Sequence, residues 1–596
     1  MTGDVLLPFR DLVEAGRLLA LPLVVLGALF FAVLRSHLRR RSPTGTERHE
    51  VTWGEVGVLA LGAACLAVVY HWPLPLYLTS QIPSELQDPV LQAWHLAWGG
   101  HALLTQPLHA FQANVHWPLP NALAVTDGMI GFAPLGVLAQ SSTGALAEYN
   151  VLLVFAYALA GAGAYLLARE LGVRAGVAAV AGAAFAYAPW RVAESNHLNV
   201  LSSGGIPLAL FLLLRGYRRR SAGSIVAGWL VAVWQLSLGF ALGLQFAYLL
   251  AALGVIALVL WLQRGRPALG RAVAIATVAG VAAFAVVGGL LASPYLTLVR
   301  EVPGAARDLG DVKELSPPPR AYLAAASENI LWARATAGPR EELRSEGEQA
   351  LFPGVLTVAL ALGGLASAVY SRRLRLGLAA GIFLLVVLSL GLSLAGGRYS
   401  YLWLYEYAPG WAGVRTPGRL MTLVSLGLAL LAAAGAEPLL RRLRRPLTVG
   451  LMSVALVGVV VTEGFNRVDL TPVPPSPAGQ RGLSAPQVHL PIDLTPNQLY
   501  AFWSIDDGFP LLLNGGGSPP DTLLTTLQDR IFHRFPDRRT VAELRAVGVR
   551  AVILHPDLAR GTGWSRMMRR PVTGLPLRKT ERGSVVVYEI PPRPAG

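Results

Sequence analysis

The sequence predicts an α-helical polytopic membrane protein with a small C-terminal α/β domain. Of the 596 residues, 53% are hydrophobic and only 14% are charged, whereas roughly 25% of the residues of an ordinary soluble domain are charged. Apolar runs recur along the chain, and arginines gather in every second loop between them. These observations exclude a disordered chain and argue against a series of soluble domains.

The apolar runs predict about 12 transmembrane helices, because a helix that crosses the hydrocarbon needs roughly 20 mostly apolar residues. The runs lie near residues 17–35, 56–78, 147–168, 174–190, 198–214, 222–239, 241–262, 272–292, 351–370, 376–395, 418–436 and 446–462. Several of them are rich in Ala and Gly, which suits close packing of helices in lipid. The apolar piece 129–138 is too short to span and is expected at the interface or as a re-entrant segment.

Basic residues predict the orientation of these spans. Six short loops carry 21 arginines, whereas residues 79–128 include no Lys or Arg. Short cytoplasmic loops are the basic ones, so the N-terminus, the loops 79–128, 293–350 and 396–417 and everything after about residue 463 are expected outside the cytoplasmic (inner) membrane. The net charge of +15 is then an orientation signal, and no nucleic-acid partner is expected.

Three domains are expected. They are residues 1–55, with an extra N-terminal helix and a basic loop, residues 56–462, the main membrane domain, and residues 463–596, a linker and an external α/β domain. The last domain opens with a Pro-rich linker, 472–477. After it, residues 488–490, 551–554 and 585–590 read as strands and 540–547 as a helix. The run Gly515-Gly516-Gly517 lacks the Lys-Ser/Thr ending of a phosphate cradle, so a plain loop is expected. Trp503 is expected in the core of this domain rather than in a sugar site.

The loop 79–128 holds the catalytic candidates, Asp88, Glu85 and Asp127, with no basic residue in the same loop. A carboxylate at the lipid boundary is costly unless it faces a cavity, a cation or a substrate. On a helix, Glu85 and Asp88 would share a face. A solvated loop acid or a helix cap remains the alternative for each. The spacing of Trp94, Trp98 and His101 predicts an amphipathic helix on the outer membrane surface.

Metal sites receive little support from the sequence. His95 and His101 are six residues apart, so they would not lie on the same face of a helix. Two metal ligands four residues apart would share one face. Interfacial or pocket positions are therefore favoured for these residues, as for His109 and His116. Cys65 is the sole cysteine, which excludes a disulfide within one chain. A divalent metal held by Asp88 and Asp127 stays open, because two carboxylates alone are weak evidence.

Several motifs occur in an order that is typical of one superfamily. They are Asp88-Pro89, Trp94-His95-Leu96-Ala97-Trp98, Phe111, Asn114, Pro118, Ala122-Leu123-Ala124, Asp127, Arg191, Asn196-His197-Leu198, Leu351-Phe352-Pro353-Gly354 and Val414-Arg415-Thr416-Pro417-Gly418-Arg419. With these residues, the region 56–462 resembles the bacterial GT-C glycosyltransferases, whose architecture is that of the dolichyl-phosphate-mannose and aminoarabinose transferases. The chain departs from that layout because its acidic loop follows the second predicted span and not the first.

The resemblance implies transfer of a sugar from a polyprenyl-phosphate carrier to a glycan, lipid or protein acceptor on the outer face. An inverting transfer needs a carboxylate that takes the proton of the acceptor hydroxyl, and Asp88 matches the catalytic position of the superfamily best. The expected substrate-binding residues are Trp94, His95, His101, Arg191, His197, Arg415 and Arg419. For the arginines, interface snorkelling or contact with lipid head groups is the alternative.

Two other functions remain open. One is a GT-C-like scaffold or assembly factor that binds a glycolipid without turning it over. The other is a transporter or flippase for lipid-linked sugars. Transporters favour ionisable residues and broken helices in the middle of their spans, whereas the acidic residues of this chain lie mostly outside the predicted spans.

Overall fold

The computed structural model describes residues 51–266, 268–306, 308–443, 445–517 and 522–592. These residues form two compact units. The helical unit comprises residues 51–76, 152–288 and 308–469, and the loop–tail unit comprises residues 77–151, 289–306 and 470–592. The predicted span 17–35 lies outside the described residues.

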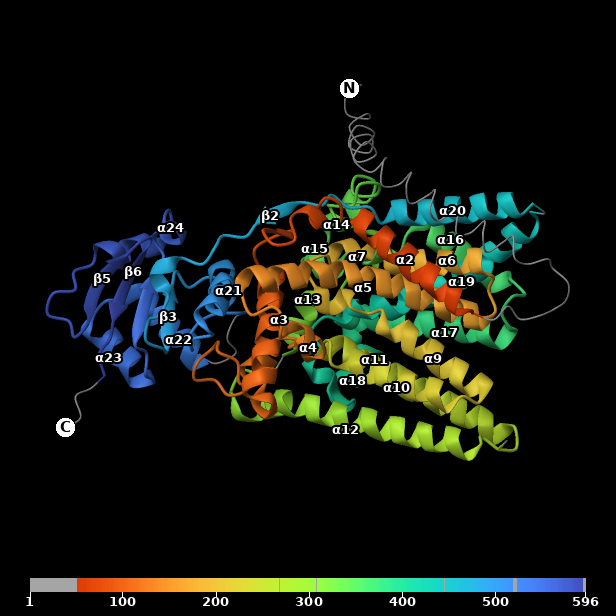
Figure 1. Ribbon diagram of the computed structural model, residues 1–596, viewed down its shortest axis with the longest axis horizontal. Coiled ribbons are helices and arrows are strands. Elements are labelled where there is room, and N and C mark those ends of the chain that lie inside the picture. The colour runs from red at the N-terminus through yellow and green to blue at the C-terminus, as the bar shows by residue number, and fades with distance from the viewer. Residues whose placement is uncertain (1–50, 267, 307, 444, 518–521, 593–596) are drawn as a thin grey trace, which may run out of the picture. The chain divides into compact units, whose positions relative to one another are not determined.

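The helical unit is a bundle whose helices run alongside one another (Figure 1). In chain order its helices are α2 Trp53–Tyr70, α5 Ser142–Leu171, α6 Ala175–Ala186, α7 Trp190–Ala193, α8 Leu198–Leu201, α9 Gly205–Arg219, α10 Ala222–Leu236, α11 Phe240–Gln263, α12 Arg271–Glu301, α13 Leu309–Leu315, α14 Ala337–Glu341, α15 Glu346–Gln349, α16 Val355–Ala366, α17 Arg372–Ser389, α18 Tyr401–Tyr407, α19 Met421–Arg441 and α20 Pro446–Glu463. The boundaries between the two units fall within α5 and α12.

Within the described residues, seven helical segments are long and apolar enough to cross a membrane. They are Trp53–Tyr70, Ser142–Leu171, Leu198–Arg219, Phe240–Gln263, Arg271–Glu301, Pro417–Arg441 and Pro446–Glu463. Of the other predicted spans, α6, α10 and α16 are helices of 12, 15 and 12 residues, and α17 carries three arginines in its first turn. The chain is a multi-pass membrane protein, and the number of 12 spans stays a prediction.

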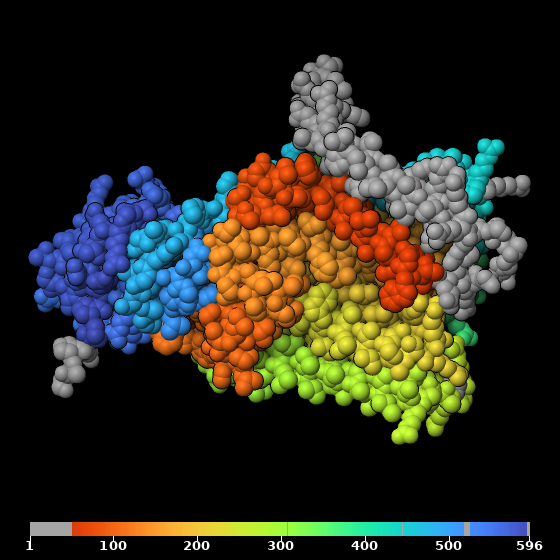
Figure 2. Space-filling model, in the orientation of Figure 1, coloured from red at the N-terminus to blue at the C-terminus, as the bar shows by residue number. Residues whose placement is uncertain are grey.

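The outer faces of the bundle are apolar. Val278 on α12 is 70% exposed and Phe383 on α17 is 71% exposed, and Figure 2 shows the side of α12 open to the surroundings. A soluble protein rarely exposes such continuous apolar surface, whereas hydrocarbon chains accept it at no cost. These faces are therefore suited to contact with lipid.

Small residues allow the helices to approach closely, as expected. A Cβ atom on Gly435 of α19 would lie 1.9 Å from the carbonyl oxygen of Leu360 on α16. A Cβ atom on Gly364 would lie 2.0 Å from the carbonyl oxygen of Leu431. Only glycine fits at these two positions, so the crossing of α16 and α19 depends on both.

Arginines of the basic loops also neutralise buried carboxylates. Arg169 lies 2.6 Å from an oxygen of Glu55, which also accepts a hydrogen bond from the Tyr165 hydroxyl at 2.8 Å. Glu437, which is buried on α19, pairs with Arg174 and Arg441. These arginines therefore have a structural role besides the orientation role that their positions predict.

The loop–tail unit combines the 79–128 loop with the tail. Its elements are β1 Gln81–Pro83, α3 Asp88–Thr105, α4 Ala133–Gly136, β2 Leu470–Pro472, β3 Gln487–Leu490, α21 Leu494–Trp503, α22 Thr522–Arg534, α23 Arg538–Val547, β4 Ala551–Leu554, α24 Pro556–Ala559, the 3-10 helix η12 Gly563–Arg569, β5 Arg578–Arg582 and β6 Val585–Glu589. The antiparallel pair β1–β2 joins Gln81 to Pro472. Pro472 of the predicted linker thus lies in a strand paired with the loop, whereas residues 473–477 form no helix or strand.

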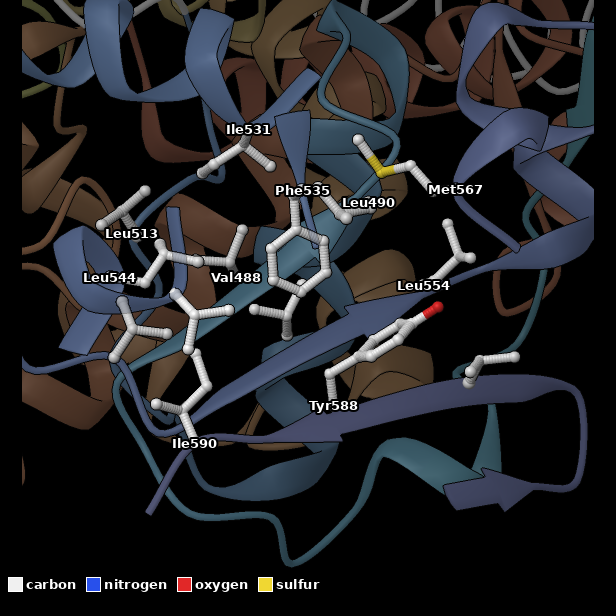
Figure 3. Close-up of a cluster of buried hydrophobic side chains, with 14 of the residues drawn as sticks. Val488, Leu490, Leu513, Ile531, Phe535, Leu544, Leu554, Met567, Tyr588 and Ile590 are labelled. Atoms are coloured by element: carbon white, nitrogen blue, oxygen red, sulfur yellow. The ribbon is translucent and has the colours of Figure 1, made fainter. Parts of the chain in front are cut away.

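The tail contains a four-stranded sheet in the order β3-β4-β6-β5, with β3 and β4 parallel and the other pairs antiparallel. Helices α22 and α23 cover one side of it, where the rings of Phe535 and Tyr588 meet edge to face (Figure 3). The predicted strands and helix of the tail all occur within a residue or two of their expected bounds. Trp503 is buried, as expected, and its indole donates a hydrogen bond to the carbonyl of Pro474.

Two buried histidines join strands β3 and β4. The Gln487 amide nitrogen donates to the carbonyl of Leu483, so its oxygen accepts from Nε2 of His489 at 3.2 Å. The other ring nitrogen of His489 is therefore an acceptor, and Nε2 of His555 donates to it at 3.0 Å. The His489 ring must be neutral for this chain of hydrogen bonds to form, because its Nδ1 accepts.

We expect acid to weaken the tail through these histidines. Burial lowers the pKa of His555 to about 3 and holds the pKa of His489 well below its usual range, where the neighbouring His555 also lowers it. An unfolded histidine titrates near pH 6.5. Stability is thus complete above about pH 7 and falls as the pH is lowered toward 3, because the unfolded chain then binds more protons. The protection factors of the β3 and β4 amides should fall less between pH 7.5 and 5 in His555→Gln than in the wild type. An equal fall in the two proteins would contradict this.

We expect Glu55→Ala to destabilise the helical unit strongly. Removing one partner of a buried ion pair leaves the other charge uncompensated, at a cost of about 3–5 kcal/mol. Thermal unfolding in detergent measures the effect. Glu342→Gln is the control, since Glu342 forms a largely exposed pair with Arg320, and such pairs contribute little. Similar melting temperatures for the two variants would argue against a structural role of Glu55.

Candidate functional site

Helix α3 carries the first group of candidate residues. Asp88-Pro89 opens it, and proline suits the first turn because no backbone donor is needed there. The residues between Pro89 and Gly100 are all buried, including Trp94 and Trp98. The predicted helix is confirmed, but its tryptophans are buried in the protein and do not form the apolar face of a surface helix. Tryptophans at helical spacing form a buried face here, because other segments of the same unit cover both sides of the helix.

Helix α3 crosses α4 at two glycines. A Cβ atom on Gly100 would lie 2.0 Å from the carbonyl carbon of Gly136, and one on Gly136 would lie 2.0 Å from the carbonyl oxygen of Leu96. The two backbones are therefore in direct contact. The apolar piece 129–138, which was expected at the interface or as a re-entrant segment, supplies α4 for this contact.

Asp88 is the first residue of α3 and is partly buried. The side-chain amide of Gln498 on α21 donates a hydrogen bond to its Oδ1 at 3.3 Å. The N-terminus of a helix stabilises a negative charge, so both features place hydrogen-bond donors or positive partial charge beside Asp88. Glu85 lies before the helix, after a bend at Ser84 with φ of 69°, and is exposed. The expectation that Glu85 and Asp88 share a helical face is thus wrong.

The histidines of α3 have different surroundings. Nε2 of His95 lies 2.8 Å from the hydroxyl of Thr126. Burial lowers the pKa of His95 to about 4, although the charge of Asp88 acts in the opposite direction. The ring of His101 packs against Phe509 with centroids 4.5 Å apart, and burial also lowers its pKa. Both rings are neutral at physiological pH, so they can offer hydrogen bonds but no positive charge.

Asp127 lies between two residues whose backbone is hydrogen-bonded to Tyr295 of the same unit. The hydroxyl of Tyr295 donates to the carbonyl of Thr126 at 3.2 Å and accepts from the backbone N–H of Gly128 at 3.4 Å. Asp127, between these two residues, is partly exposed. In the part of the chain that the structure describes, no group of three or more His, Cys, Asp or Glu residues is arranged to hold a metal ion.

Asn114 connects the loop to the tail. Its side-chain oxygen accepts from the indole of Trp94 at 3.2 Å, and its amide nitrogen donates to the hydroxyl of Ser504 and to the carbonyl of Pro510. Its backbone carbonyl accepts from Leu512. One amide side chain thus ties α3 to the segment after α21. The tail is therefore part of the surroundings of Asp88 and not a separate accessory domain.

A second polar cluster lies in the helical unit. Arg419 faces Glu348 in a two-point contact, with nitrogen–oxygen distances of 3.0 and 2.6 Å. Nδ1 of His197 lies 2.7 Å from a carboxylate oxygen of Glu194, and its Nε2 lies 3.9 Å from Glu348. Arg419 also lies 3.9 Å from Glu194. We call these four residues the Arg419 cluster.

The Arg419 cluster balances two carboxylates against basic groups. Burial acts to raise the pKa of Glu348, but Arg419, His197 and Arg415 together hold it below its usual range. Arg415 is exposed. Arg415, Arg419 and His197 were predicted as binding residues. Two acids that were not predicted, Glu194 and Glu348, lie beside them.

Arg191 differs from the other predicted arginines. It is fully buried, and its guanidinium donates to the hydroxyl of Ser203 and to the carbonyl of Leu201. Its charge also lies 4.8 Å from the centre of the Tyr157 ring. Arg191 therefore holds α7 against α8 and α5, and its burial argues against direct contact with a substrate.

Comparison with solved structures identifies the fold. A cryo-EM structure of the arabinofuranosyltransferase AftD from Mycobacteria matches with a TM-score of 0.52 and 14% sequence identity, over 91% of this chain and 42% of that chain. This chain thus spans less than half the length of the AftD chain. ArnT from Cupriavidus metallidurans, in the apo state, matches with a TM-score of 0.33 and 15% identity, over 89% of this chain and 97% of that chain. No protein-family model and no curated protein matches the chain. The AftD match shows that this chain shares the fold of part of that arabinofuranosyltransferase.

We expect Gly100→Ala to disturb α3. The added methyl group would overlap the backbone at Gly136, and overpacking of this kind costs about 1–3 kcal/mol. Thermal unfolding of the protein in detergent is the measurement. Gly289→Ala is the matched control, because a Cβ atom at this helical position meets nothing within 4 Å, and alanine favours helices. A melting temperature of Gly100→Ala equal to that of the control would refute the close contact between α3 and α4.

Proposed function

We propose that the chain is a membrane glycosyltransferase that moves a sugar from a polyprenyl-phosphate carrier to an acceptor on the outer face of the cytoplasmic membrane. The fold likeness to a membrane arabinofuranosyltransferase supports the general class. The position of Asp88 carries the specific proposal. This carboxylate is partly exposed at the start of a rigid, buried helix, where an amide of the tail contacts it.

In the proposed reaction Asp88 acts as the general base. It accepts the proton of the acceptor hydroxyl while the hydroxyl oxygen attacks the anomeric carbon of the donor. The bond from that carbon to the phosphate oxygen breaks, and the phosphate leaves with the electron pair. A general base must lie within hydrogen-bond reach of the proton that it accepts. Packing of α3 against α4 and α21 would fix its direction, which favours a productive geometry.

The departing phosphate needs positive charge. We assign this role to Arg415, which is exposed, and to Arg419, whose present partner is the carboxylate of Glu348. Phosphate and carboxylate both accept two parallel hydrogen bonds from a guanidinium. Glu348 would therefore hold Arg419 in a defined orientation until the phosphate replaces it. His197 could donate a further hydrogen bond.

The proposal includes the predicted orientation. With the arginine-rich loops in the cytoplasm, the N-terminus, the 79–128 loop and the tail lie outside it, where the acceptor is found. The tail then forms an extracytoplasmic α/β domain. We propose that Trp94, His95 and His101 on α3 shape the surroundings of Asp88. Trp94 and His95 are buried, which favours an indirect role for both.

We expect Asp88→Asn to reduce sugar transfer by roughly 10²–10⁴-fold, the usual contribution of a general base, while the protein still folds and inserts. Asparagine has nearly the same size as aspartate, and its side-chain oxygen can still accept the hydrogen bond from Gln498. Transfer from a polyprenyl-phosphate-sugar donor in proteoliposomes is the measurement, with melting temperature as a check on folding. Glu85→Gln is the matched comparison, because Glu85 is an exposed acid three residues away. If Glu85→Gln lost activity and Asp88→Asn kept it, the base would be assigned wrongly.

The same proteoliposome assay distinguishes the proposed transferase from a scaffold and from a flippase. A scaffold would bind the lipid-linked sugar without product, and its binding would not respond to Asp88→Asn. A flippase would move the donor across the bilayer with no transfer to an acceptor. Either result with the wild-type protein would overturn the proposed transferase.

A further inference from the structure

The tail has a charge that the orientation of the spans does not explain. Residues 525–592 contain 13 Lys or Arg and six Asp or Glu. The rule that places basic residues in the cytoplasm concerns short loops next to spans. This segment is long and folds around its own core. Its basic excess therefore needs another account.

Part of the excess is neutralised within the tail. Glu543 pairs with Arg530 and Arg539, Asp557 pairs with Arg560, and Glu589 pairs with Arg582. Five other arginines are exposed and form no ion pair with any described residue. We call them the arginine cluster; they are Arg534, Arg538, Arg566, Arg569 and Arg578.

The fold gathers the arginine cluster around one turn. Arg534 ends α22 and Arg538 begins α23, so they flank the turn between the two helices. Arg570, just after η12, donates to the carbonyl of His533 at 2.8 Å and also to that of Phe535. The Lys579 ammonium donates to the carbonyl of Met568, which brings the start of β5, with Arg578, to η12.

The geometry of η12 turns two of these arginines outward. In a 3-10 helix, side chains three residues apart lie above one another. Trp564 and Met567 form the buried row, in contact with the core of the tail. Arg566 and Arg569 form an exposed row. The two side chains therefore leave the same side of the helix, about 6 Å apart along its axis.

The position of Arg538 is unfavourable for the stability of its helix, α23. Arg538 begins α23, where the helix dipole disfavours a positive charge. The acid beside it, Asp537, caps this helix by accepting hydrogen bonds from the backbone and hydroxyl of Thr540. Its carboxylate is therefore committed to the cap. Arg538 therefore does not stabilise the fold through its charge, and this charge is available to bind an anion.

We propose that the arginine cluster binds an anionic glycan, which is the acceptor of the proposed transfer. The inference rests on the proposed function, because that function places the tail on the side of the acceptor. A guanidinium binds a carboxylate or a phosphate through two parallel hydrogen bonds. Among the described residues of 525–592, Phe532 is the only large hydrophobic side chain counted as exposed, at 37%. A surface that inserts into lipid would expose several, so a glycan is favoured over a membrane.

The test measures binding of the full-length protein in detergent to immobilised polygalacturonate, with neutral dextran as the reference surface. We expect the wild type to bind polygalacturonate only, and binding to weaken with salt. Arg566→Gln/Arg569→Gln should weaken it at least tenfold, roughly the value of one charged hydrogen bond. The matched control is Arg560→Gln/Arg582→Gln, which removes the same charge from arginines that already have carboxylate partners.

Equal weakening by the two double variants would overturn the proposal, because binding would then follow net charge alone. So would binding to vesicles containing phosphatidylglycerol, or to duplex DNA, with no binding to polygalacturonate. The assay contains no sugar donor, so Asp88→Asn should bind as the wild type does. An inactive Asp88→Asn protein that binds supports both proposals, and a transferase that does not bind polygalacturonate refutes this one alone.

Discussion

The direct contact between the backbones of α3 and α4 is the constraint on which the Asp88 region depends. Only a hydrogen atom fits between the helices at Gly100 and Gly136, and this closeness leaves α3 fully surrounded along its first three turns. Burial in turn removes charge from His95 and directs the Trp94 indole to Asn114. The one carboxylate that opens the helix is thus set in a rigid apolar frame, which is how a catalytic group keeps its direction.

Charge is used in three ways along the chain. Next to the predicted spans, some arginines neutralise buried acids such as Glu55 and Glu437. In the Arg419 cluster, the carboxylate of Glu348 pairs with the guanidinium of Arg419. In the tail, the exposed arginines Arg538, Arg566, Arg569 and Arg578 form no ion pair with a described residue. The overall net charge of +15 therefore adds together groups with different physical tasks.

Local patterns in the sequence predicted much of the fold. Apolar length predicted the long membrane helices, and short apolar runs predicted the strands of the tail, because both depend on near neighbours. The sequence did not reveal that Trp94 and Trp98 are buried, since covering them takes residues of the tail such as Phe509. It also missed Gln498 and Glu348. Gln498 is 410 residues from Asp88 and Glu348 is 71 residues from Arg419, and such a distant partner leaves no periodic trace beside the residue that it contacts.

The hydrogen bond between Asn114 and Ser504 joins residues 390 positions apart. At 5–20 residues per second, a ribosome needs about 20–80 s to synthesise the chain between them. During this time the nascent loop has left the translocation machinery, but the covering for its tryptophans does not yet exist. The order of synthesis thus makes the 79–128 loop the first part of its unit to emerge and the last to be completed. A premature stop codon after the final span would therefore remove the environment of Asp88 itself.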